Sequence, residues 1–204
     1  MRSKYFEMSI LSLIQLYTIV IGLSFVSLIE KSLLNENSSI FSFKELQFYN
    51  ILTFLTILFV ITRFYHGNVV YLYRTYINND LPVKGAVLFD FWFILLQGGL
   101  LFVIVHFLKE IKVLYILMSI LILSDSLWMF TIIKYPRTMN QQNNIIVEFR
   151  WMFSNLISGG LLIILLLLLP SILSLILLPI IILINSLINY YMNYSYLFEN
   201  ISIT

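Results

Sequence analysis

Long apolar runs alternate with short polar stretches along this chain, and each run has the length of a membrane-spanning helix. About 20 residues at 1.5 Å each cross the hydrocarbon core of a bilayer, so about 18 or more consecutive apolar residues predict a span. We therefore expect an all-α polytopic membrane protein with six spans. Their approximate ranges are 8–29, 48–66, 86–108, 113–133, 151–169 and 172–192.

The last two spans are predicted from one uninterrupted stretch. From Trp151 to Met192 the chain has no charged residue, and one straight helix of that length would measure about 63 Å, twice the core thickness. Pro170 favours a turn between two spans, because proline ends or kinks a helix at the preceding residue. The alternative is five spans, with the last segment re-entrant or lying at the membrane interface.

Composition supports a single membrane domain over residues 1–204. Hydrophobic residues make up 60% of the chain and charged residues only 11%, far from the balance of soluble domains. The connectors 30–47, 67–85 and 134–150 are too short to form cores of their own, since domains below about 40 residues usually need staples. Any chemistry therefore lies within the helices or is supplied by a partner.

Basic residues are unevenly divided between the two sides of the predicted bundle. With the N-terminus inside, the inner segments hold eight of the 12 Lys and Arg residues and the outer segments hold four. Because basic loops stay cytoplasmic, we expect a cytoplasmic N-terminus in the plasma (inner) membrane, with an organellar inner membrane as the alternative. Six spans place the C-terminus inside and five place it outside.

Three charged residues lie within the apolar runs: Arg63, Asp90 and Asp125. Ionisable residues in hydrocarbon are costly, and they usually pair with one another or line a polar pathway. Counted from the outer helix ends at 1.5 Å per residue, their depths differ by less than about 10 Å, which an arginine side chain can span. The sequence therefore predicts that Arg63 pairs with Asp90 or Asp125 inside the bundle.

Two of these three residues also have purely structural explanations. Gly67 can end the second helix just after Arg63 and His66, where cations complement the helix dipole and arginine can reach the interface. Asp90 lies near the start of its helix, where the dipole favours an acid. Asp125 has no such explanation, because it lies about 12 Å from the nearer helix end.

Amides and glycines within the spans are candidates for helix packing. Small residues allow close approach in lipid, and an interhelical amide hydrogen bond contributes about 1 kcal/mol. Asn185 and Asn189 share a helix face, and Gln97 is followed by Gly98 and Gly99. We expect these five residues to hold helices together.

The segment after the second apolar run is rich in aromatic and basic residues. It contains His66, Asn68, Tyr71, Tyr73 and Arg74 at the predicted inner surface. Functionally, it would be a docking site for a cytosolic partner, a nucleotide or an anionic lipid headgroup. Structurally, it would be an aromatic and basic belt at the membrane interface.

Several chemistries lack their sequence signatures. The chain has no cysteine, which removes thiolate catalysis and cysteine metal ligands. No His-Glu-x-x-His, Gly-x-Ser-x-Gly or Walker A motif occurs, and His66 and His106 lie at opposite predicted ends, too far apart to share a metal or haem. We expect no enzymatic activity, no cofactor, no metal site and no direct nucleic-acid binding, since basic residues are not clustered.

These features predict a small homo-oligomeric membrane component that is channel-like or perturbs the membrane under the control of a cytosolic partner or ligand. Small bacterial membrane effectors, including those of antiviral defence, are of this type. A homo-oligomer is expected because so small a bundle seldom encloses a pathway alone. One alternative is a non-conducting subunit that anchors a larger complex, including an organellar respiratory or synthase assembly. The other is a small transporter with Asp125 as its proton or ion site.

Overall fold

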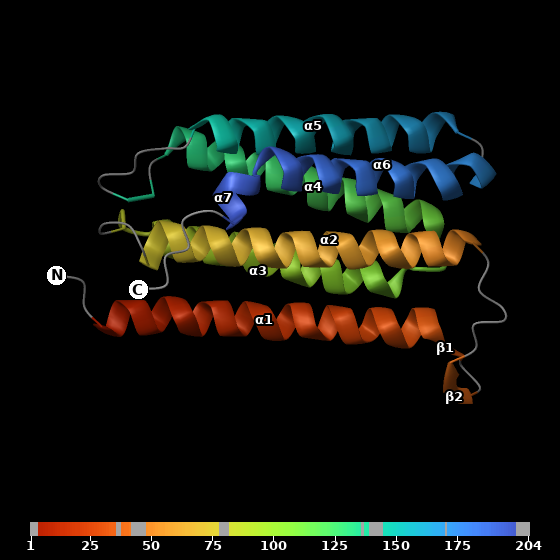
Figure 1. Ribbon diagram of the computed structural model, residues 1–204, viewed down its shortest axis with the longest axis horizontal. Helices are drawn as coiled ribbons and strands as arrows, with labels where there is room; N and C mark the ends of the chain where they lie inside the picture. The colour runs from red at the N-terminus through yellow and green to blue at the C-terminus, as the bar shows by residue number, and fades with distance from the viewer. Residues whose placement is uncertain are drawn as a thin grey trace.

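The protein folds into long helices that run side by side (Figure 1). The computed structural model describes residues 4–35, 38–41, 48–77, 82–135, 137–138, 145–169 and 171–198. Six long helices lie within these residues, which confirms the predicted all-α class. They are α1 (Lys4–Leu33), α2 (Phe48–Leu72), α3 (Ala86–His106), α4 (Ile111–Lys134), α5 (Ile145–Leu168) and α6 (Ser171–Met192).

Most of these helices are suited to a bilayer. In the described part of the chain, five are long and apolar enough to cross a membrane, namely α1 to α5, with α2 extended to Ile77. The described apolar stretch of α6, Ile176–Met192, is shorter, although the helix has 22 residues and measures about 33 Å. The chain therefore has a membrane-protein architecture, and the sixth span stays a prediction. Pro170, at the predicted turn, lies outside the described residues.

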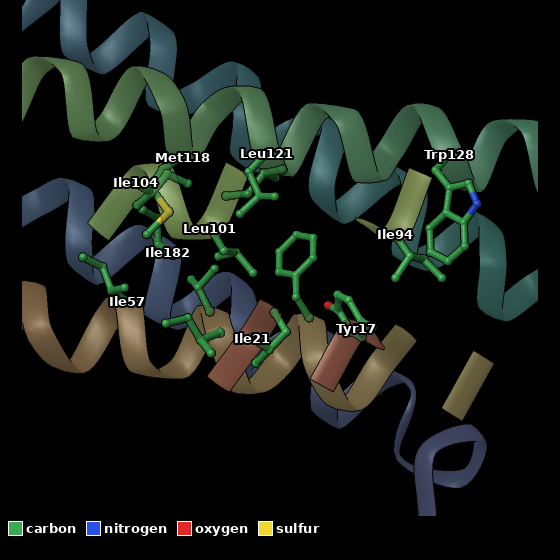
Figure 2. Packing of buried hydrophobic residues seen from close by; sticks show 14 of the residues in the cluster. Tyr17, Ile21, Ile57, Ile94, Leu101, Ile104, Met118, Leu121, Trp128 and Ile182 are labelled. Atoms are coloured by element: carbon green, nitrogen blue, oxygen red, sulfur yellow. The ribbon is translucent and has the colours of Figure 1, made fainter. Parts of the chain in front are cut away.

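The six long helices form a closed ring. In order around the ring, α1 packs against α3, α3 against α4, α4 against α5, α5 against α6, α6 against α2 and α2 against α1. Figure 2 shows apolar side chains from α1, α2, α3, α4 and α6 filling the space between helices, among them Tyr17, Leu101 and Ile182. Residues that face the centre of this ring are therefore removed from lipid.

The second helix does not end at Gly67, so that prediction was wrong. Helix α2 continues to Leu72 and is followed by a π-helical turn, η2 (Tyr73–Ile77). Gly67 serves close packing instead, because a Cβ atom there would lie 2.6 Å from Cη2 of Trp151 on α5. A contact with another helix, and not a change of backbone direction, explains this glycine.

Short elements occur at both ends of the bundle. The connector between α1 and α2 contains an antiparallel hairpin of β1 (Leu34–Asn35) and β2 (Ser38–Phe41). At the opposite end, where α1 begins, Val83 N donates to Arg137 O at 2.9 Å and Pro82 forms a bridge with Thr138. The α2–α3 and α4–α5 connections are thus joined at this end, which we call the N-terminal end of the bundle. A short helix, α7 (Tyr194–Phe198), follows α6.

Candidate functional site

Asp90 is the centre of a buried cluster near the N-terminal end of the bundle. Its carboxylate is 0% exposed. Oδ2 accepts hydrogen bonds from the hydroxyls of Tyr71 and Tyr76, both at 2.6 Å, and from Nε of Arg137 at 3.0 Å. Oδ1 accepts from Nε1 of Trp128 at 3.0 Å and lies 3.0 Å from Nη2 of Arg137. We call these five residues the Asp90 cluster.

Arg137 reaches this cluster from the connection that follows α4. Its Nη2 also donates to Thr131 Oγ1 at 2.7 Å, which fixes the guanidinium against α4. Burial alone would lower the pKa of Arg137, but the neighbouring Asp90 carboxylate raises it above the usual value. The sequence predicted that Arg63 pairs with Asp90 or Asp125. In the structure, Arg63 lies near Asp125, and Arg137 lies beside Asp90. The backbone of a connector can fold back into a bundle, so helix depth did not reveal this pair.

Asp125 is the centre of a second buried cluster, deeper in the bundle. Its side chain is 2% exposed. Oδ1 accepts from Nε2 of Gln97 at 3.1 Å, and Oδ2 accepts from Nε1 of Trp151 at 2.9 Å and Nδ2 of Asn155 at 2.6 Å. Nη2 of Arg63 lies 3.9 Å from Oδ2. The carboxylate is therefore held by three neutral donors, with the arginine farther away.

Hydrogen bonds extend this cluster in both directions. On one side, Asn68 Nδ2 donates to Gln97 Oε1 at 3.1 Å and to the Tyr17 hydroxyl at 3.0 Å. On the other side, Oδ1 of Asn155 accepts from Arg63 Nη2 and, at 3.4 Å each, from Asn185 and Asn189. We call the connected set the central network: Tyr17, Arg63, Asn68, Gln97, Asp125, Trp151, Ser154, Asn155, Asn185 and Asn189. Each of the helices α1 to α6 contributes to it.

Arg63 is the least complete member of the central network. Its side chain is 3% exposed, and its guanidinium lies over the rings of Trp151 (6.0 Å to the ring centre) and Phe64 (5.6 Å). Nη2 is hydrogen-bonded, but Nε and Nη1 have no hydrogen-bond partner among the described residues. Buried donors without partners are rare in native structures, so these two nitrogens require an explanation.

The predicted docking surface after the second apolar run is not a surface throughout. Asn68 and Tyr71 are buried and bonded within the bundle, because α2 continues past Gly67 and turns these positions toward the ring centre. Of the other predicted residues, Tyr73 is exposed, Arg74 is half-buried, and His66 packs on the rings of Tyr190 and Phe198. The structure therefore places Asn68 and Tyr71 inside the bundle, and a docking site at the remaining residues stays a prediction.

The residues predicted to pack helices differ in their surroundings. A Cβ atom at Gly98 would lie 3.1 Å from Cε2 of Tyr17, so α1 and α3 approach closely there. Gly99 faces open space, whereas Gln97, Asn185 and Asn189 belong to the central network. In the described part of the chain, no group of three or more His, Asp or Glu side chains could hold a metal ion.

Comparisons with known proteins give no relative. No family model matches the chain, and no curated protein and no solved structure matches it. The geometry of the two buried clusters is therefore the basis for a functional proposal.

Proposed function

We propose that this protein is a small membrane transporter whose central network is the solute site, inside the helix ring of one chain. The observation that carries this proposal is that each helix from α1 to α6 contributes a polar side chain to one connected network around Asp125 and Arg63. Polar and ionisable side chains that face a bundle interior typically mark solute or ion pathways.

The depth of the network fits a transport site. Asp125 lies about 21 Å from the start of α4 and about 14 Å from its end, counted at 1.5 Å per residue. Membrane transporters commonly bind their substrates near the middle of the bilayer, between helices. A site at this depth can be opened to one side of the membrane at a time.

Packing alone gives a weaker account of the network. Interhelical amide hydrogen bonds stabilise helix association in lipid by about 1 kcal/mol each, and they need no charge. A buried ion pair adds little to stability, since well-packed apolar residues often replace such a pair without loss. The buried charge on Arg63, and its two donors that lack partners among the described residues, are better explained by a solute that binds there.

The Asp90 cluster would then close the network at the N-terminal end. It connects η2, α3, α4 and the connection after α4 through the hydrogen bonds to Asp90. We propose that this end faces the cytoplasm if the protein lies in a plasma membrane, as the distribution of Lys and Arg favours. In an organellar inner membrane, the alternative, this end would face the interior of the organelle. Opening the site to one side of the membrane and then to the other would involve no enzymatic step.

Cysteine accessibility tests the proposal, because the natural sequence contains no cysteine. Asn185→Cys and Asn189→Cys place a thiol in the central network, and we expect charged methanethiosulfonate reagents to modify both in membranes. Leu178→Cys and Ile182→Cys are the matched controls, since these residues are 0% exposed and lie on the same helix. The controls should stay unmodified. If the network positions react no faster than the controls, water does not reach the network and the proposal fails.

A channel-like assembly of several copies, under the control of a partner, is the second candidate. The exposed side of α1 carries Gln15, and polar side chains in lipid usually bond to a neighbouring helix. Gln15→Leu would then reduce the size of the assembly in mild detergent, measured by light scattering. An unchanged mass would remove support for an assembly through α1.

A further inference from the structure

We infer that Arg63 binds a monovalent anion, which enters and leaves the central network together with one proton carried by Asp125. This inference rests on the proposed transport function and names the class of solute for the same site.

The first argument is the unused binding capacity of Arg63. A guanidinium carries five N–H donors and keeps its charge in proteins. In this buried position, Nη2 contacts Asn155, while Nε and Nη1 have no partner among the described residues. Donors left in that state destabilise a protein, and a bound anion would satisfy them. The aromatic rings of Trp151 and Phe64 flank the same guanidinium.

The second argument is that Asp125 does not occupy Arg63 fully. The nearest approach of the two groups is 3.9 Å, between Nη2 and Oδ2. The amide of Asn155 lies between them, because its Nδ2 donates to Asp125 and its Oδ1 accepts from Arg63. Arg137, in contrast, contacts Asp90 through two nitrogens, each at 3.0 Å. Arg63 therefore keeps N–H donors that a third group can bind. In the Arg137–Asp90 pair, by comparison, the carboxylate contacts the guanidinium directly.

A cation is a poor alternative at this position. Both oxygens of Asp125 already accept hydrogen bonds from N–H groups of Gln97, Trp151 and Asn155. A cation would also lie beside the positive charge of Arg63. The groups on Arg63 that lack partners within the described part of the chain are donors, so they select an acceptor with negative charge.

The third argument concerns charge balance. Arg63 and Asp125 together carry no net charge, and adding a monovalent anion would leave one uncompensated negative charge in the membrane interior. Such a charge is costly. A proton bound to a carboxylate oxygen of Asp125 restores neutrality, and it leaves when the anion leaves. Only this O–H bond forms and breaks.

Asp125 is the group that can carry this proton. The ionisable side chains that face it are Arg63 on α2, which stays charged, and Tyr17 on α1. Its contacts from α3 and α5 are Gln97, Trp151 and Asn155, which do not ionise in the physiological range. The nearby α6 members of the network, Asn185 and Asn189, are amides. Anion binding should therefore follow the protonation of one carboxylate.

Trp151 is a built-in reporter for the test. Its indole donates to Asp125 and lies beside the Arg63 guanidinium, so a heavy halide bound at Arg63 should quench its fluorescence. We would titrate the full chain in detergent with sodium bromide and sodium iodide at constant ionic strength. Saturable quenching is expected, and the halide affinity should rise about tenfold for each unit of falling pH while Asp125 is ionised in the free protein.

Two tryptophan variants check where the signal arises. Trp151→Phe should remove the saturable quenching. Trp92→Phe is the matched control, because Trp92 lies on the exposed side of α3, and this variant should retain the quenching. A saturable signal that survives Trp151→Phe would place the halide elsewhere and overturn the inference.

Substitutions at the two charged residues separate the anion from the proton. Arg63→Gln should weaken halide binding about tenfold or more, since a hydrogen bond to a charged group is lost. Arg63→Lys keeps the charge and should restore part of the affinity, which also serves if the glutamine variant does not fold. Asp125→Asn should keep halide binding and lose its dependence on pH.

The outcomes distinguish this inference from the transport proposal. Saturable quenching that does not change with pH in the unsubstituted protein would overturn the coupling to a proton. Absence of saturable quenching at every pH would overturn the anion site. In that case, reaction of Asn189→Cys with charged reagents would still support a transporter, and its solute would belong to another class.

Discussion

Replacing Gly67 by alanine would test the central network without substituting any of its members. The new Cβ would lie 2.6 Å from Cη2 and 3.0 Å from Cζ2 of Trp151, whereas ordinary contacts begin at 3.4 Å. The indole would have to move by several tenths of an ångström. Its Nε1 donates to Asp125 at 2.9 Å, so this movement would stretch or break a bond at the centre of the network.

The expected cost of Gly67→Ala follows from three contributions. Overpacking a well-packed site costs about 1–3 kcal/mol. Loss of a hydrogen bond to a charged carboxylate costs about 1.5–3 kcal/mol. Alanine offsets about 1 kcal/mol of this, because it is the better helix former. A net loss of about 3 kcal/mol is expected when the bond to Asp125 breaks.

Thermal denaturation in detergent, followed by size-exclusion chromatography, measures this loss. A chain of this size loses about 2–4 °C in Tm for each kcal/mol, so Gly67→Ala should melt roughly 6–12 °C lower. Gly22→Ala and Gly99→Ala are matched controls, since a Cβ at either position meets no atom within 4 Å. Their Tm should stay the same or rise. If the Tm of Gly67→Ala equals that of the control variants, the close contact with Trp151 is refuted. Our explanation of this glycine then fails as well.

Two further predictions concern other buried contacts. Arg137→Gln should lower the free energy of unfolding by about 3–5 kcal/mol, because it leaves the Asp90 carboxylate buried without its cation. Adding Asp90→Asn should recover most of the lost Tm. A double variant no more stable than Arg137→Gln alone would contradict the pairing. Gly159→Ala should lower the Tm, because its Cβ would lie 2.7 Å from Cγ of Leu123 and such overpacking costs about 1–3 kcal/mol. Gly160→Ala, whose Cβ would meet nothing within 4 Å, should not lower the Tm. Equal Tm values would argue against close packing of α4 and α5 at this position.

The membrane class could be predicted from the sequence because lipid imposes one strong rule. Backbone groups in hydrocarbon have no water to bond, so spanning segments must be helices or closed barrels. Each apolar run then predicts a helix of known length, and α3 and α4 begin and end within about two residues of their predicted ranges. The prediction that the second helix ends at Gly67 was wrong, since α2 continues to Leu72. The reason for that glycine lies in Trp151 of another helix, and no local pattern reveals such a contact.

The charged members of the site could be predicted for a similar reason. Burial of Arg63 and Asp125 in hydrocarbon is too costly without function or partners, so their presence alone was informative. Tyr17 and Trp151 were missed, because aromatic residues are common in membrane helices and their register does not show which neighbour they bond. Arg137 was missed as the partner of Asp90 for another reason. It lies in a connector, where sequence position contains no information on depth.

The two acid–base pairs of this bundle show what stability alone requires. Asp90 and Arg137 meet at 3.0 Å, and tyrosine and tryptophan donors complete the carboxylate. Both charges are then paired and hydrogen-bonded, which is the condition under which burial is tolerated. Asp125 and Arg63 are equally buried but lie 3.9 Å apart, with two guanidinium nitrogens lacking partners among the described residues. If both pairs served only to hold helices together, the Arg63–Asp125 pair would stabilise the bundle less well than the Arg137–Asp90 pair does. The difference is better explained if the donors of Arg63 are used by a group that binds and leaves.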